Sequence, residues 1–79
     1  MKLTCGIVQI VKINSSYSGI TVERGMTGSL GSYNSLIEML EEPLNDQGVT
    51  PAITSALMEI RRKAEEFNWD ENALFAAMP

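Results

Sequence analysis

The chain has 79 residues, of which 44% are apolar, and six basic side chains face ten acidic ones for a net charge of −4. The length leaves room for one domain with a small core, and the apolar fraction excludes a disordered chain. The acidic balance argues against non-specific binding to nucleic acid or anionic membranes, since such binding depends on clustered Lys and Arg. A single cysteine excludes an internal disulfide, and no apolar run approaches the ~20 residues of a membrane span. We therefore expect one small α+β domain over residues 1–79, in the cytoplasm.

The first part of the chain is predicted to form a β-hairpin. Leu3 to Ile13 is rich in β-branched residues whose spacing is paired rather than alternating. This pattern predicts a strand that is partly buried on both faces, or one that changes faces at a bulge at Gly6. A turn-forming cluster follows, and Ile20 to Arg24 predicts a return strand with Ile20 and Val22 facing inward.

The next segment contains three glycines at three-residue spacing: Gly25, Gly28 and Gly31. It is predicted to be a flexible loop, part of which could form a short third strand. Ser32 then predicts the cap of a helix from Tyr33 to Glu42. Its apolar residues follow helical spacing: Tyr33, Leu36, Ile37 and Leu40. Pro43 ends this helix, because proline disfavours helical geometry in the residue before it.

One apolar stripe identifies the second helix, with spacings of four, three, four and three: Ile53, Leu57, Ile60, Ala64 and Phe67. Thr50 supplies a hydroxyl cap and Pro51 the first helical position, and the helix should end near Asn68. A last short helix is predicted with Asp70 as its cap, flanked by Trp69 and Leu74 at the positions of a hydrophobic staple. The predicted architecture is an N-terminal antiparallel β-hairpin or small sheet packed by two to three C-terminal helices, with the stripe mostly used in the core.

This sequence contains few residues of the types that commonly act in catalysis. It contains no histidine, the commonest general base and zinc ligand. Cys5 lies on an apolar strand and is interpreted as a small core residue. The three glycines lack the Lys-Ser/Thr pair of a phosphate-binding loop, and no calcium-loop pattern is present. We expect no enzymatic activity, no cofactor and no bound metal.

Two groups of side chains are candidates for binding a partner. An acidic group shares one helix face and the turn beyond it: Glu38, Glu41, Glu42 and Asp46. The ordinary interpretation is a solvated face, and the sharper hypothesis is a docking surface for a basic groove on a partner. An apolar group contains the adaptable or anchoring types that are enriched at interfaces: Met26, Met58, Trp69 and Phe75. The alternative interpretation is that these side chains belong to a small, irregularly packed core, which would contain the same residue types.

The leading functional hypothesis is a non-enzymatic protein-binding module that regulates or inhibits a larger protein. Its size, acidity and element order, strands first and helices last, are similar to those of small phage-encoded anti-defence proteins, including anti-CRISPR inhibitors. One alternative is a homodimer whose interface is the apolar stripe. Another is a helix-turn-helix-like DNA-binding regulator built on Gly48 to Leu57, although Pro43 and the acidic charge count against it. The one basic run, Arg61 to Lys63, is expected to pair with glutamates of its own helix.

Overall fold

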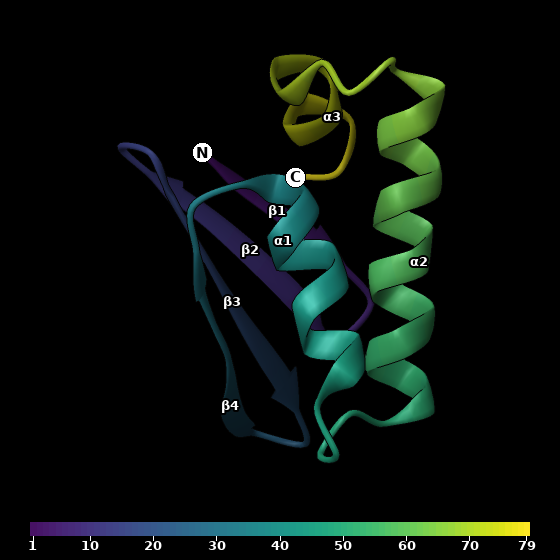
Figure 1. Cartoon of the computed structure of the whole chain (residues 1–79). Coiled ribbons are helices and arrows are strands. Elements are labelled where there is room, and N and C mark those ends of the chain that lie inside the picture. The colour runs from purple at the N-terminus through teal and green to yellow at the C-terminus, as the bar shows by residue number, and fades with distance from the viewer.

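The computed structural model describes residues 1–79 and places a four-stranded antiparallel sheet before the helices (Figure 1). The strands follow one another in both sequence and sheet order: β1 (Lys2–Cys5), β2 (Val8–Ile13), β3 (Ser16–Glu23) and β4 (Met26–Tyr33). The helical elements come next: α1 (Leu36–Glu41), the 3₁₀ helix η1 (Glu42–Asn45), α2 (Pro51–Glu66) and α3 (Glu71–Ala77). This arrangement confirms the predicted α+β class.

The segment predicted as one strand from Leu3 to Ile13 is two strands. Gly6 adopts a φ of +56°, a left-handed conformation that glycine reaches without steric cost, and the chain reverses there. Cys5 consequently pairs with Val8 across the turn. Gly6 therefore marks a hairpin turn between two strands rather than a bulge in a single strand.

The glycine-rich segment is a full strand, β4, so its interpretation as a flexible loop is wrong. The alternative of a short third strand was correct in type but underestimated the length of the strand. Arg24 and Gly25 both have positive φ, 54° and 77°, and join β3 to β4 through a two-residue turn. A bulge lies where β4 passes Gly19 and Ile20 of β3, and Gly31 takes a φ of +95° there. Two strands alone would be marginally stable, and this third hairpin completes the sheet.

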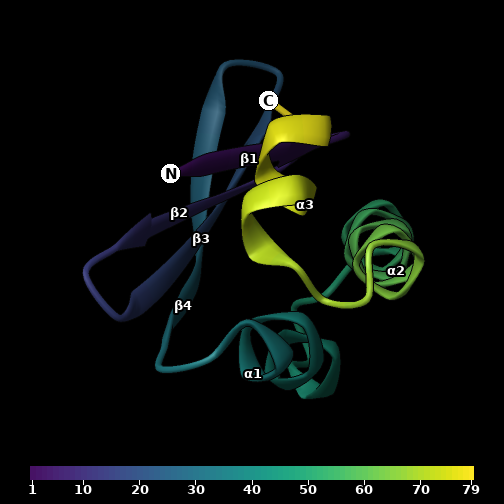
Figure 2. The same cartoon turned by 90° about the horizontal axis from the view of Figure 1, so that it is seen from above.

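The helices cover one face of the sheet and leave the other open (Figures 1 and 2). Leu3, Ile10 and Gly19 are cross-strand neighbours, and all three are buried on the helical side. Because side chains alternate along a strand, Ile20 and Val22 lie on the opposite, open face. The prediction that these two residues face inward is wrong, since a pattern of alternation fixes a shared face but not which face the helices cover.

The core is a single cluster of 14 buried hydrophobic residues from both layers: Leu3, Val8, Ile10, Tyr17, Leu36, Met39, Leu40, Ile53, Ala56, Leu57, Ile60, Ala64, Leu74 and Phe75. Four residues of the predicted stripe belong to it, and Phe67 packs against its edge. The stripe therefore lies inside the domain, as expected, and is not available as an interface between two copies.

The first helix begins later than predicted. Ser35, not Ser32, caps α1, and its Oγ accepts the backbone N–H of Glu38 at 3.2 Å. Tyr33 is still in β4, paired with Tyr17. The shorter helix buries Met39 fully and leaves Ile37 50% exposed. Ile37 was expected on the buried face of this helix, and that prediction is wrong. The α-helix does end before Pro43, although the chain continues as η1.

The caps of the last two helices are as predicted. Thr50 accepts the backbone N–H of Ile53, and Pro51 is the first residue of α2. Asp70 accepts the N–H groups of Asn72 and Ala73 at the start of α3. These side chains satisfy donors that the first turn of a helix leaves without partners. Thr50 and Asp70 therefore fix the residues at which α2 and α3 begin.

Candidate protein-binding surface

The four predicted acidic residues lie together on the exposed side of α1 and η1. Glu41 is the only one with an ion pair, because its Oε1 lies 2.8 Å from Arg61 of α2. Glu38 stands in the first turn of α1, where a negative charge interacts favourably with the helix dipole, and its carboxylate accepts the Ser35 hydroxyl at 3.3 Å. Much of this group is thus used in shaping α1.

The end of the acidic group forms the turn into α2. The Oδ1 of Asp46 accepts the backbone N–H of Gly48 at 3.0 Å and stabilises the connection after η1. Glu42 is exposed and makes no side-chain hydrogen bond or ion pair. Of the four carboxylates, Glu42 is therefore the one that can be changed with least effect on the fold.

Few cations balance this surface, because most are paired elsewhere. Arg62 and Lys63 pair with Glu59 and Glu66 of their own helix, as predicted. Arg61 differs from the prediction, because its short ion pair is with Glu41 of α1 and its contact with Glu65 is long, at 3.8 Å. The hydrogen bond from Arg62 lowers the pKa of Glu59. Lys12 pairs with Glu71 on α3, which leaves Lys2 and Arg24 as the cations without an ion pair. On the α1–η1 side, Arg61 compensates Glu41, and the carboxylates of Glu38, Glu42 and Asp46 have no ion pair.

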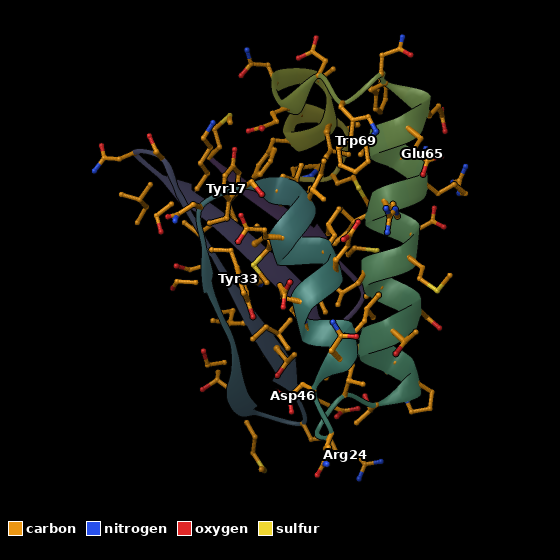
Figure 3. All side chains as sticks on the ribbon, viewed as in Figure 1. Tyr17, Arg24, Tyr33, Asp46, Glu65 and Trp69 are labelled. Atoms are coloured by element: carbon orange, nitrogen blue, oxygen red, sulfur yellow. The ribbon has the colours of Figure 1, made fainter.

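The predicted apolar group does not form one patch. Met26 is 75% exposed at the tip of the β3–β4 hairpin, and Met58 is 59% exposed on α2. Trp69 is half-buried at the opposite end of the molecule from Asp46 and Arg24 (Figure 3). Phe75 is only 5% exposed and belongs to the core. Phe75 is thus a packing residue, and the prediction that it contributes to a binding surface is wrong.

Met26 and Asp46 line two neighbouring hollows. One is a groove of about 240 Å³ between the β3–β4 hairpin and the η1–α2 connection, lined by strand residues and by Pro43, Asp46, Val49 and Ile53. The other, of about 510 Å³, lies at the hairpin tip beside Met26. Thr21 and Gly28 line both hollows. The groove thus has a mixed lining, in which the hydrophobic side chains of Leu30, Val49 and Ile53 lie together with polar residues and the acidic Asp46.

The strand beside this groove, β4, is an open edge of the sheet. The backbone N–H of Val22 points toward β2, where it donates to Ile7 at 2.8 Å. Because Val22 and Thr27 are partners across β3 and β4, the backbone N–H and C=O of Thr27 point away from β3, to the outside. Nothing in Met26–Tyr33 is charged or proline, the residue types that commonly protect an edge strand.

Two backbone groups in the second half of β4 have side-chain partners. The Ser29 hydroxyl accepts the N–H of Gly31 at 3.1 Å, and the Tyr33 hydroxyl donates to the Leu30 carbonyl at 3.2 Å. At the far edge of the sheet, the N–H of Thr4 in β1 donates to the Met78 carbonyl at 2.8 Å. The first half of β4, around Thr27, is therefore the freer part of this edge, and the neighbouring Gly28 and Ser29 line the groove.

The sequence interpretation missed this edge because it treated the segment as a flexible loop with, at most, a short third strand in part of it. The signals that could have found it are the turn at Arg24 and Gly25 and the uncharged run that follows. Its pairing with the η1–α2 connection is a tertiary contact, which the local pattern does not encode.

Other reactive groups serve the fold. No group of three or more His, Cys, Asp or Glu side chains lies close enough to hold a metal ion. Burial, with a smaller contribution from the charge of Glu59, raises the pKa of Cys5 and so disfavours its thiolate. Tyr17 and Lys12 both donate to Oε1 of Glu71, at 2.6 and 2.9 Å. That cluster joins β2 and β3 to α3 and borders neither the groove nor the hairpin hollow.

No protein-family model matches this chain, and comparison with curated proteins and with solved structures likewise gives no match. None of the helices has the length and apolar character needed to cross a membrane.

Proposed function

We propose that the protein is a non-enzymatic protein-binding module that regulates or inhibits a larger protein. The proposal includes inhibitors of the phage anti-defence kind, which the size, acidity and element order resemble. The observation that carries it is the free edge of β4 beside a groove whose lining includes three hydrophobic side chains and the acidic Asp46. An extended segment of the partner binds there as an added strand.

Strand addition fits the chemistry of this site. An added strand gains main-chain hydrogen bonds from the outward N–H and C=O of Thr27. Because side chains alternate along a strand, every second side chain of the segment points toward the helical layer and into the groove. The hydrophobic side chains of Val49 and Ile53 favour an aliphatic side chain at that position.

The acidic surface adds charge selection to this binding. Glu42 and Asp46 stand on η1 and in the turn after it, and Asp46 lines the groove itself. A lysine or arginine flanking the extended segment interacts favourably with these carboxylates, mainly by accelerating association. The preferred partner segment is therefore extended, with an aliphatic residue next to basic ones.

The test is a comparison of two substitutions at Thr27. Thr27→Pro removes the outward N–H without removing a hydrogen bond to β3, so the strand should form while strand addition fails. Thr27→Ala keeps the N–H and is the matched control. Immobilised variants are incubated with native host lysate, and bound proteins are quantified by mass spectrometry. We expect a stoichiometric partner that wild type and Thr27→Ala retain and Thr27→Pro loses by about 10-fold or more, the range of one or more hydrogen bonds.

A second arm tests the charge contribution. Glu42→Lys should weaken capture of the same partner at moderate salt, and the difference from wild type should shrink as salt rises. Equal capture by all the Thr27 variants would exclude strand addition at β4. Unchanged capture by Glu42→Lys would separately exclude the acidic surface.

A further inference from the structure

The open face of the sheet carries an apolar stripe that no element of the chain covers. Its four members are β-branched and lie on the two central strands: Val11, Ile13, Ile20 and Val22. Val11 pairs with Ser18, so Ile20, two residues along β3, is its diagonal neighbour on the same face. Ile13 and Val22 extend the stripe at either end and are 67% and 40% exposed.

Strand β2 carries two apolar residues on each face, with Gln9 on the open face and Lys12 on the helical face. Val8 and Ile10 are buried beneath the helices, while Val11 and Ile13 occupy the other face. Antiparallel sheets with one solvated face usually alternate apolar and polar residues, whereas continuous apolar strands are typical of sheets covered on both sides. Here only one side is covered within the chain.

Charge points to a second copy of this chain as the cover. The open face carries no acidic residue, and Lys2 is its one charged side chain. The acidic residues of this −4 molecule lie on the helices, in their connections and at the hairpin tip instead. Two copies therefore meet with least repulsion through their open faces, and a strongly charged partner finds no complement there.

We propose that two copies pack through these open faces around a two-fold axis, with the stripes of the two sheets in contact. With strands of four to eight residues, the face measures about 400 Å² in projection, so the pair buries about 800–1,000 Å². That area is at the lower end for specific interfaces, so the dimer is weak and forms at high micromolar concentration. This dimer differs from one formed through the stripe of α2, which is buried.

Sedimentation velocity from about 10 µM to about 1 mM tests this dimer. Ile20→Lys places a charge in the centre of the interface and should weaken dimerisation by about 100-fold or more, because an unpaired buried charge costs several kcal/mol. Ile37→Lys is the matched control: Ile37 is exposed on α1, on the helical side, and its substitution should leave dimerisation unchanged. Glu42→Lys should also dimerise as wild type, which separates this test from that of the proposed function.

Methyl NMR of the wild-type protein provides a readout that needs no variant. On concentration from about 10 µM to about 1 mM, the methyl signals of the four stripe residues should shift while those of Ile37 stay fixed. A monomer at about 1 mM would overturn the proposal and leave the face to a different protein. Concentration-dependent shifts confined to other methyl groups would also overturn it.

Discussion

Gly19 lets a side chain of α1 reach the surface of the sheet. It is buried on the helical face of β3, and a Cβ built there would lie 2.5 Å from Cε of Met39 and 3.1 Å from Cβ of Leu30. Met39 is itself fully buried. The absence of a side chain at Gly19 therefore makes room for a methionine, whose flexible thioether fills irregular space in cores.

Gly19→Ala should consequently destabilise the protein by about 1 kcal/mol, the low end of overpacking costs, because the nearest atom is the flexible end of the Met39 side chain. Urea unfolding monitored by circular dichroism measures the change. Gly48→Ala is the control, because a Cβ there meets nothing closer than 3.7 Å. The double variant with Met39→Ala tests the mechanism: the cost of Gly19→Ala should fall when Met39 is already truncated. An additive cycle would place the cost elsewhere, at Leu30.

At the scale of elements, the helices were more predictable than the strands. Thr50 and Asp70 cap α2 and α3 where the sequence places them, because capping depends on side chains within a few residues of the helix start. The full length of β4 was not predicted, since Met26–Tyr33 has one β-branched residue and four that are glycine or serine. Its pairing with β3 outweighs that weak propensity, which is common for strands.

The candidate surface was predictable only in its parts. Asp46 and Met26 could each be proposed from residue type, yet the two neighbouring hollows that they line depend on how the β3–β4 hairpin meets the η1–α2 connection. Phe75 likewise shows that residue type alone does not separate a surface residue from a core residue. Its residue type suits an interface and a core equally, and only the packing of α3 places it in the core.

The β3–β4 turn carries a residue that is unfavourable for its conformation. Arg24 has a φ of 54°, in a two-residue turn where Asn-Gly is the preferred pair. Arg24→Asn should therefore stabilise the protein by about 0.5–1 kcal/mol, as a rise in the urea midpoint. Arg24→Ala serves as the control, since alanine keeps the left-handed strain and should give no such gain. An equal gain in both variants would point instead to the charge of Arg24.

At the scale of the whole molecule, Glu71 links the two layers. Its Oε1 accepts from Tyr17 and Lys12, and Lys12 also lies over the Tyr17 ring at 5.2 Å from the ring centre. Partial burial alone would raise the pKa of Glu71, but the hydrogen bonds from Tyr17 and Lys12 outweigh it and lower that pKa. The hydrogen bond to Glu71 is the main cause that raises the pKa of Lys12.

Glu71→Gln should cost about 1–2 kcal/mol of unfolding free energy at pH 7. Since the folded pKa of Glu71 is lowered, its contribution is present above the ordinary carboxylate range of about 4 to 5 and lost as pH falls through the folded value. The difference between wild type and variant should therefore shrink when urea unfolding is repeated near pH 3. Glu65→Gln is the control, because Glu65 is exposed and its contact with Arg61 is long, at 3.8 Å. A difference that stayed constant from pH 7 to pH 3 would contradict this account.

The hydrogen bond between Thr4 and Met78 has a consequence for growth along the sheet. It occupies an N–H of β1 that another strand would need, so strand addition at β1 is disfavoured relative to β4. A copy that takes up a strand at β4 therefore presents a partly blocked edge at its other side, which works against head-to-tail growth of copies into a fibre.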